Sequence, residues 1–274
     1  MPKYMNIIDL DLILDRNPDL GDRGFQSDGR TFSLMSRPTE LKGYEPKNEG
    51  EYYYKEAYSF LANDNPVMGR HFLEKAYEMG NFGAGNDLAY GLCHGWFGER
   101  DCDAATVIYR KLARKGDPDA MNNYAFSYLL GTGVKKNLRL AEYWMWKAIR
   151  KGNIHAAASY AQLVLENTFT KISKSLGMWL CFWAADCGEP TAMNDLGLCY
   201  ETGCLVRKNL DKAYEWFMKS VEHGGGACAE FNVSRCFRYG LGVEEDERKA
   251  DAWQNLAIEH GFDIEAYNNL YDLG

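Results

Sequence analysis

The chain has no concentration of basic residues. Its 31 lysines and arginines are outnumbered by 39 aspartates and glutamates, which gives a net charge of -8. Its basic runs are no longer than pairs such as Lys135-Lys136 and Arg150-Lys151. Nucleic-acid-binding proteins gather Lys and Arg into patches that neutralise phosphates. The sequence therefore predicts no nucleic-acid partner.

Long apolar stretches are also missing. No segment approaches the roughly 18 apolar residues that a membrane-spanning helix needs. Asp9 and Asp11 interrupt the N-terminal apolar run from Ile7 to Leu14, so this run does not resemble the hydrophobic region of a secretory signal. We expect no membrane association, no export signal and a cytoplasmic location.

Motifs of catalysis and of metal binding are absent as well. The chain has no Cys-x2-Cys pair, no His-Glu-x2-His zinc motif and no Gly-x-Ser-x-Gly nucleophile elbow. The stretch from Gly131 to Lys136 is glycine-rich and ends in lysine, but it lacks the spacing of a phosphate-binding loop. The sequence predicts that the protein is not an enzyme and has neither a cofactor nor a metal ion.

The eight cysteines show no obvious pairing. An even number could form a disulfide framework in a secreted chain, but without an export signal we expect free thiols in a reducing compartment. They are Cys93, Cys102, Cys181, Cys187, Cys199, Cys204, Cys228 and Cys236.

What the chain does contain is a repeat. An alanine recurs at Ala84, Ala120, Ala156, Ala192 and Ala229, at spacings of 36, 36, 36 and 37 residues. A fixed period of this length is typical of a solenoid of stacked helix pairs. Each unit of such a fold buries its core against its neighbours.

Other residues recur at fixed distances from the opening alanine, which we number offset 0. Offsets 0, 4 and 8 lie on one face of a first helix, and offsets 21, 24 and 28 on one face of a second. Glycines at offsets 11 and 32 are expected to end the two helices in the left-handed conformation, with Asn167 in the glycine's place in one unit. Small residues at offsets 0 and 28 permit close helix contact. The tryptophans at offset 24 are expected in the core: Trp144, Trp216 and Trp253.

The repeat resembles the Sel1-like repeat (SLR), a relative of the tetratricopeptide repeat. The best matches are the turns Gly131-Thr132-Gly133-Val134 and Gly240-Leu241-Gly242-Val243, and the helix segments from Ala141 to Ala148 and from Arg248 to Trp253. The resemblance implies an all-α fold, a right-handed α-α superhelical solenoid. It also implies a role in protein–protein interaction, often as an adaptor. Some cysteine-rich relatives pair cysteines eight residues apart, a spacing found here between Cys228 and Cys236.

Two regions are expected. Residues 48–274 form the solenoid, with units starting near 48, 84, 120, 156, 192 and 229, and a short capping helix from 266. Residues 1–47 form an irregular N-terminal extension, because prolines and glycines break the periodicity there. Its apolar run from Ile7 to Leu14 is expected to pack on the first helix pair.

A partner is expected on the concave face, which the first helices line. Offsets 2, 3, 6 and 10 should point into this groove, and offsets 2 and 3 are repeatedly Asn or Asp. Such side chains could hydrogen-bond the backbone of an extended peptide, with offsets 6 and 10 adding specificity. The alternative is that these Asn residues make inter-helix hydrogen bonds or caps. The candidate partner-binding residues are Asn123, Phe126, Asp195, Asn232, Arg235 and Tyr239.

The leading hypothesis is therefore a non-catalytic module that binds another protein or peptide, as a monomer or weak homodimer. A second is a toxin-neutralising protein of the immunity type, since the acidic charge would suit a basic target. A third hypothesis is an enzyme with a site near the N-terminal extension, but no specific residue supports it.

Overall fold

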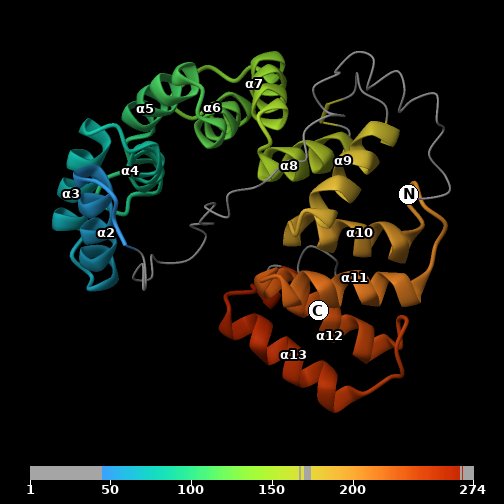
Figure 1. Ribbon diagram of the computed structural model, residues 1–274. Helices are drawn as coiled ribbons and strands as arrows, with labels where there is room; N and C mark the ends of the chain where they lie inside the picture. The colour runs from blue at the N-terminus through green and yellow to red at the C-terminus, as the bar shows by residue number, and fades with distance from the viewer. Residues whose placement is uncertain (1–44, 167, 170–173, 266, 268–274) are drawn as a thin grey trace. The chain divides into compact units, whose positions relative to one another are not determined.

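A computed structural model describes residues 45–166, 168–169, 174–265 and 267. Within them the chain forms twelve α-helices and no strand, which confirms the all-α fold class and the six helix pairs (Figure 1). The helices are α2 (Glu49–Ala62), α3 (Pro66–Glu78), α4 (Phe82–His94), α5 (Cys102–Lys115), α6 (Pro118–Leu130), α7 (Leu138–Arg150), α8 (Ile154–Leu165), α9 (Lys174–Asp186), α10 (Pro190–Thr202), α11 (Leu210–Glu222), α12 (Gly226–Tyr239) and α13 (Glu247–Glu259).

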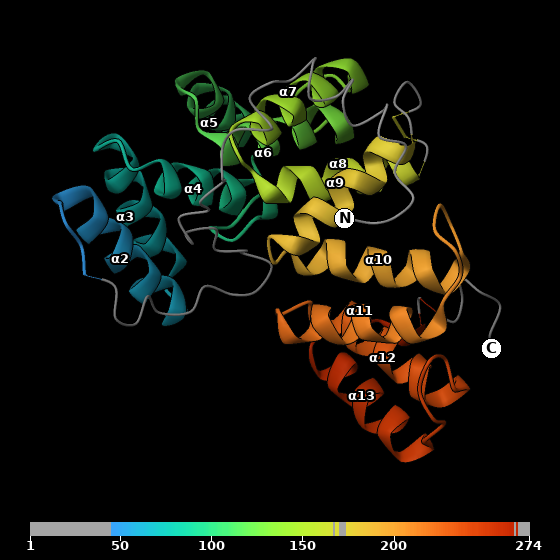
Figure 2. The same cartoon turned by 45° about the vertical axis from the view of Figure 1, so that its right-hand side comes forward.

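The helices fall into two compact units that divide after Ala156. In the N-terminal unit, α2 to α7 form three successive pairs, and each second helix also packs against the first helix of the next pair. The C-terminal unit contains α9 to α13 in the same kind of succession, after the greater part of α8 (Figure 2). The predicted N-terminal packing of Ile7–Leu14 lies outside the described residues, and so does the predicted capping helix from 266 apart from Tyr267.

Local sequence explains where the helices begin and end. Asn and Asp side chains accept hydrogen bonds from the first-turn backbone, as Asn81 does from the Ala84 N–H and Asp117 from the Ala120 N–H. Four first helices, α4, α6, α10 and α12, end at a glycine in the left-handed conformation, for example Gly131 at φ 80°, whereas the atypical α2 ends at Asn63. This confirms the predicted role of the offset-11 glycines, while Asn167 is not among the described residues.

Small residues let the helices pack closely. The opening alanines of all five regular units are completely buried. The residue at offset 28 is equally buried in each unit, and it is small in all units but one, which has Leu112. The other members at offset 28 are Ala76, Ala148, Ala184, Ser220 and Ala257. The predicted register of the helix contacts is therefore confirmed.

The offset-24 tryptophans lie less deep than expected. Trp144, Trp216 and Trp253 are only partly buried, whereas the next residue is fully buried in two of these units, as Met145 and Phe217. The ammonium groups of two lysines lie over tryptophan rings, 4.8 Å from the ring centroid for Trp144 and 4.3 Å for Trp216. The expectation of core tryptophans was therefore wrong for Trp144 and Trp216, whose partly exposed rings are each covered by a lysine, whereas the partly buried Trp253 packs against the hydrophobic core formed by α11, α12 and α13.

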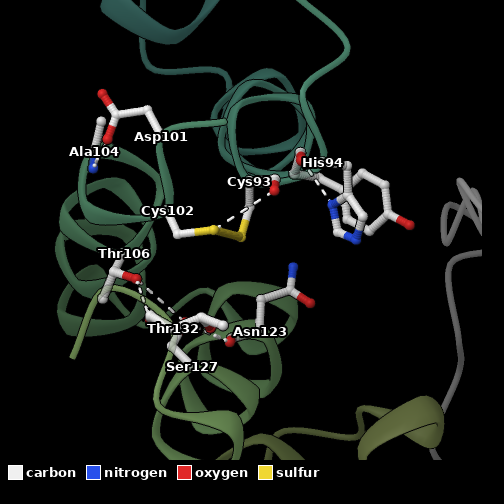
Figure 3. The surroundings of a disulfide bond; sticks show 10 residues. Cys93, His94, Asp101, Cys102, Ala104, Thr106, Asn123, Ser127 and Thr132 are labelled. Carbon is white, nitrogen blue, oxygen red and sulfur yellow. Dashed lines mark hydrogen bonds between the residues drawn. A yellow bond between two sulfur atoms is a disulfide. The ribbon is translucent and has the colours of Figure 1, made fainter. Parts of the chain in front are cut away.

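The expectation of free thiols is wrong for one pair. Cys93, near the end of α4, and Cys102, at the start of α5, form a disulfide with Cα atoms 4.3 Å apart (Figure 3). The other six cysteines are free, including Cys228 and Cys236. The bonded residues occupy offsets 9 and 18, at the two ends of one inter-helix turn, where the next unit has Leu129 and Leu138. Their spacing of nine therefore suits a link across the turn.

This disulfide is expected to stabilise the N-terminal unit. Because it closes a loop of about ten residues, its loss should lower the free energy of unfolding by about 2–3 kcal/mol in the chain-entropy description. Urea unfolding of the Cys93→Ser/Cys102→Ser variant should show the loss, and dithiothreitol should reproduce it in the unchanged chain. Cys187→Ser, at an exposed free thiol, serves as the control. Equal midpoints with and without the link would contradict the expectation.

Candidate binding surface

In the N-terminal unit, the polar residues of the first helices mostly serve internal contacts. The carboxylate of Asp87 on α4 accepts hydrogen bonds from two tyrosine hydroxyls of α2, at 2.6 Å from Tyr54 and 2.7 Å from Tyr58. Burial raises the pKa of Asp87 to about 6, against the opposing effect of these two hydrogen bonds. Asp87 therefore joins two neighbouring first helices and is not available to a partner.

The repeated asparagines of α4 and α6 are also largely buried within the solenoid. The Asn86 amide donates to the Asp117 carboxylate at the start of α6, with 2.9 Å between Nδ2 and Oδ1. The side-chain oxygens of Asn86 and Asn122 are buried without a hydrogen-bond partner. Asn123 and Phe126 are partly buried, and the Asn123 carbonyl accepts a hydrogen bond from the Ser127 hydroxyl (Figure 3). Asn123 and Phe126 are the two predicted site residues in this unit, and each therefore keeps some exposed surface.

In the C-terminal unit, Asn232 joins two first helices. Its amide donates to Asn194 Oδ1 on α10 over 2.8 Å, and its own Oδ1 accepts from Arg235 Nη1 over 3.0 Å. Arg235 also forms an ion pair with Glu201 of α10, with 2.5 Å between Nη2 and Oε1. These contacts correspond to the inter-helix alternative considered for the repeated asparagines.

Asp195 is the exception among these polar side chains. Its Oδ2 atom is buried and has no hydrogen-bond partner. Burial and, to a smaller extent, the nearby carboxylates Glu166 and Glu189 together raise the pKa of Asp195 to about 7. The side chain is therefore partly protonated near neutral pH, which lowers the cost of its unpaired oxygen.

Two of the predicted residues line one open surface pocket. Arg235 and the 62% exposed Tyr239 belong to a pocket of about 370 Å³, which we call the α12 pocket. Its volume falls in the range of small-ligand sites. Its complete lining is Phe231, Ser234, Arg235, Arg238, Tyr239, Gln254, Ile264 and Tyr267. Asp195 does not line it, and Asn123 and Phe126 belong to the N-terminal unit.

Sequence reasoning missed most of this lining. Arg238 lies three residues after Arg235 on α12, so both project from one helix face. This spacing of three residues could have predicted a pair of arginines on one face of the helix. Gln254 comes from α13, and Ile264 and Tyr267 follow it, so only the tertiary structure brings them together.

Neither a metal site nor a membrane helix is found in the part of the chain that the structure describes. No three His, Cys, Asp or Glu side chains there lie close enough together to hold a metal ion. Every helix within those residues is too short or too polar to cross a membrane.

Stacked helix pairs with small residues at their contacts define a helical-repeat solenoid. The chain belongs to the Sel1 repeat family, whose sequence model matches residues 50–81, 85–117, 118–153, 190–225 and 229–262. This confirms the resemblance drawn from the repeat pattern. Among curated relatives, the Sel1-repeat-containing protein YjcO of Escherichia coli K12 is 27% identical over 208 residues, which covers 74% of this chain and 88% of YjcO.

Solved structures show the same fold. A Sel1 repeat protein from Oxalobacter formigenes superposes with a TM-score of 0.64 at 24% identity, over 83% of this chain and 67% of that one. The immunity protein Pa5087 from Pseudomonas aeruginosa superposes with a TM-score of 0.60 at 24% identity, over 82% and 87% of the two chains. At these identities the likeness establishes the fold alone.

Proposed function

We propose that this protein is a non-catalytic module that binds another protein or peptide on the face lined by its first helices, with the α12 pocket as an anchoring site. Sel1 repeats generally mediate protein–protein interaction. The observation that carries the proposal is the α12 pocket itself, because two residues predicted to contact a partner line it. The cytoplasmic location predicted from the sequence is not part of the proposal, since the Cys93–Cys102 disulfide is typical of oxidising compartments.

The contacts divide the predicted residues into two groups. The Asn232 side chain hydrogen-bonds Asn194 on α10 and Arg235 on its own helix. It therefore holds Arg235 in position and does not itself line the pocket. Tyr239 is exposed at the rim and is suited to be a contact of high energy, as tyrosines at interfaces often are. Asn123, Phe126 and Asp195 remain in the proposal as further contacts along the first helices.

The test is affinity co-purification from the native host, with identification of bound proteins by mass spectrometry. Tyr239→Ala should reduce recovery of a stoichiometric partner about tenfold or more, as loss of an interface tyrosine often does. Helicity by circular dichroism should be unchanged. Tyr143→Ala is the matched control, because Tyr143 on α7 is 51% exposed and lies outside the pocket. A partner that survives Tyr239→Ala but is lost with Tyr143→Ala would place binding on the second helices and contradict the proposal.

The triple variant Asn123→Ala/Asp195→Ala/Asn232→Ala examines the remaining contacts. If it keeps the partner that Tyr239→Ala loses, the polar residues at offset 3 serve only the packing of the solenoid.

A toxin-neutralising role is the second candidate function. It is favoured by the net charge of -8 and by the fold shared with Pseudomonas aeruginosa immunity proteins. On this hypothesis the captured partner is basic and inhibits growth when expressed alone, and co-expression of this protein restores growth. A partner that is harmless alone would exclude this role.

A further inference from the structure

We propose that the α12 pocket binds a carboxylate group of the partner, with an apolar side chain of the same partner beside it. This inference rests on the proposed function and gives its anchoring site a ligand class. Either a C-terminal carboxylate or an acidic side chain could supply the group.

The composition of the pocket is the first argument. Its lining contains two arginines and a glutamine but no aspartate or glutamate. The chain as a whole has the opposite balance, with 39 acidic and 31 basic residues. A surface that is locally rich in N–H donors within an acidic protein favours an oxyanion over a cation.

The two guanidinium groups are held in different ways. Arg235 is fixed by Glu201, whose side chain is only 14% exposed, and by Asn232. Arg238 donates to Asp251 Oδ1 over 2.7 Å, but the Asp251 side chain is 60% exposed. An exposed ion pair contributes little free energy, so a ligand carboxylate can compete with Asp251 for Arg238. We therefore assign the ligand contact to Arg238 and a supporting position to Arg235.

Gln254 supplies a second donor. Its Oε1 accepts a hydrogen bond from Arg238 Nη2 over 3.1 Å. This contact orients the glutamine so that its amide nitrogen, rather than its oxygen, is left to face a ligand. A carboxylate can accept from a guanidinium and an amide together, since each of its oxygens has two lone-pair directions.

The remaining lining forms an apolar wall. The Phe231 ring stacks on Phe262 with centroids 4.1 Å apart and meets the Tyr267 ring edge-on at 4.7 Å. Ile264 and the exposed Tyr239 extend this wall. An aliphatic or aromatic side chain next to the carboxylate would bury its surface here.

Charge favours a carboxylate over a phosphate. Each arginine already has one carboxylate partner, and only the Arg238–Asp251 pair is exposed enough to open. A single negative charge can take the place of Asp251 without leaving excess charge in the pocket. A phosphate group, with a charge near -2, would not be balanced by one released guanidinium.

The test uses the full chain and three short synthetic peptides. They are acetyl-Gly-Ala-Phe with a free C-terminal acid, the same peptide with a C-terminal amide, and acetyl-Gly-Asp-Phe-Gly amide. NMR shifts of the Gln254 side-chain amide and the Arg238 Nε–H report binding at the pocket. At least one carboxylate peptide should bind about tenfold more tightly than the C-terminal amide, and whichever does identifies the source of the group.

Three variants assign the contact. Arg238→Gln should lower the affinity for the carboxylate peptide about tenfold. Asp251→Asn should raise this affinity severalfold, because the Asp251 carboxylate no longer competes for Arg238. Arg248→Gln, at an exposed position of α13 outside the pocket lining, should change nothing. Circular dichroism checks that each variant is folded.

The inference fails if neither carboxylate peptide binds more tightly than the peptide with the C-terminal amide, or if Arg238→Gln leaves the affinity of the tighter carboxylate peptide unchanged. Tighter binding of inorganic phosphate at the same signals would also overturn the carboxylate assignment. If the peptides fail while Tyr239→Ala still loses the protein partner, the binding function stands and only the ligand class is wrong.

Discussion

Replacement of Ala148 by aspartate is expected to destabilise the protein by about 3–5 kcal/mol, the cost of an unpaired buried charge. Ala148 is completely buried on α7, at a repeat position that is completely buried in every unit. A carboxylate there must either remain ionised in a water-free contact or take up a proton, and both are unfavourable. Because each repeat depends on its neighbours for a core, the damage should extend to adjacent helix pairs.

Urea unfolding followed by circular dichroism measures this effect. Ala252→Asp on α13 is the control, because it makes the same substitution in another second helix at an exposed position. It should change the unfolding midpoint little. If Ala148→Asp were as mild as Ala252→Asp, the close helix contact assigned to this repeat position would be absent.

The register of the repeat was predictable because it depends on residue size. A position that must be small in each unit, such as Ala120 or Ala148, recurs in the sequence whatever the surrounding surface does. Recurrence in the sequence did not predict how deeply the larger residues are buried. Trp144 was placed in the core by its recurrence, yet a recurring residue can equally cover the edge of an interface.

The disulfide and the pocket were not predictable in this way. Cys93 and Cys102 meet only because one turn brings the ends of α4 and α5 together, and the repeat period contains no trace of the pair. The α12 pocket takes Arg238 from a first helix, Gln254 from a second helix and Ile264 from beyond it. Sites that combine single residues from different elements leave no periodic signal.

The turn glycines provide the second large effect. Gly242 at offset 13 has φ +75°, and a Cβ atom there would meet the backbone carbonyl of Leu210 and the Asp211 nitrogen, 2.7 Å away, at the start of α11. Gly133, at the same offset, would meet the Cys102 carbonyl at the start of α5. In both units the turn therefore packs directly on the second helix of the preceding unit, and backbone atoms cannot yield as a flexible side chain could.

Gly242→Ala should therefore cost about 2–4 kcal/mol, from backbone strain plus displacement of α11. Gly224→Ala separates the two causes, because Gly224 has φ +83° but open space around it, so only about 1 kcal/mol of strain is expected. Leu205 shows that offset 13 tolerates a side chain where there is room, since it adopts φ 60° and is 46% exposed. Equal losses for the two alanine variants in urea unfolding would mean that conformation alone, and not the approach of α11, requires glycine at offset 13.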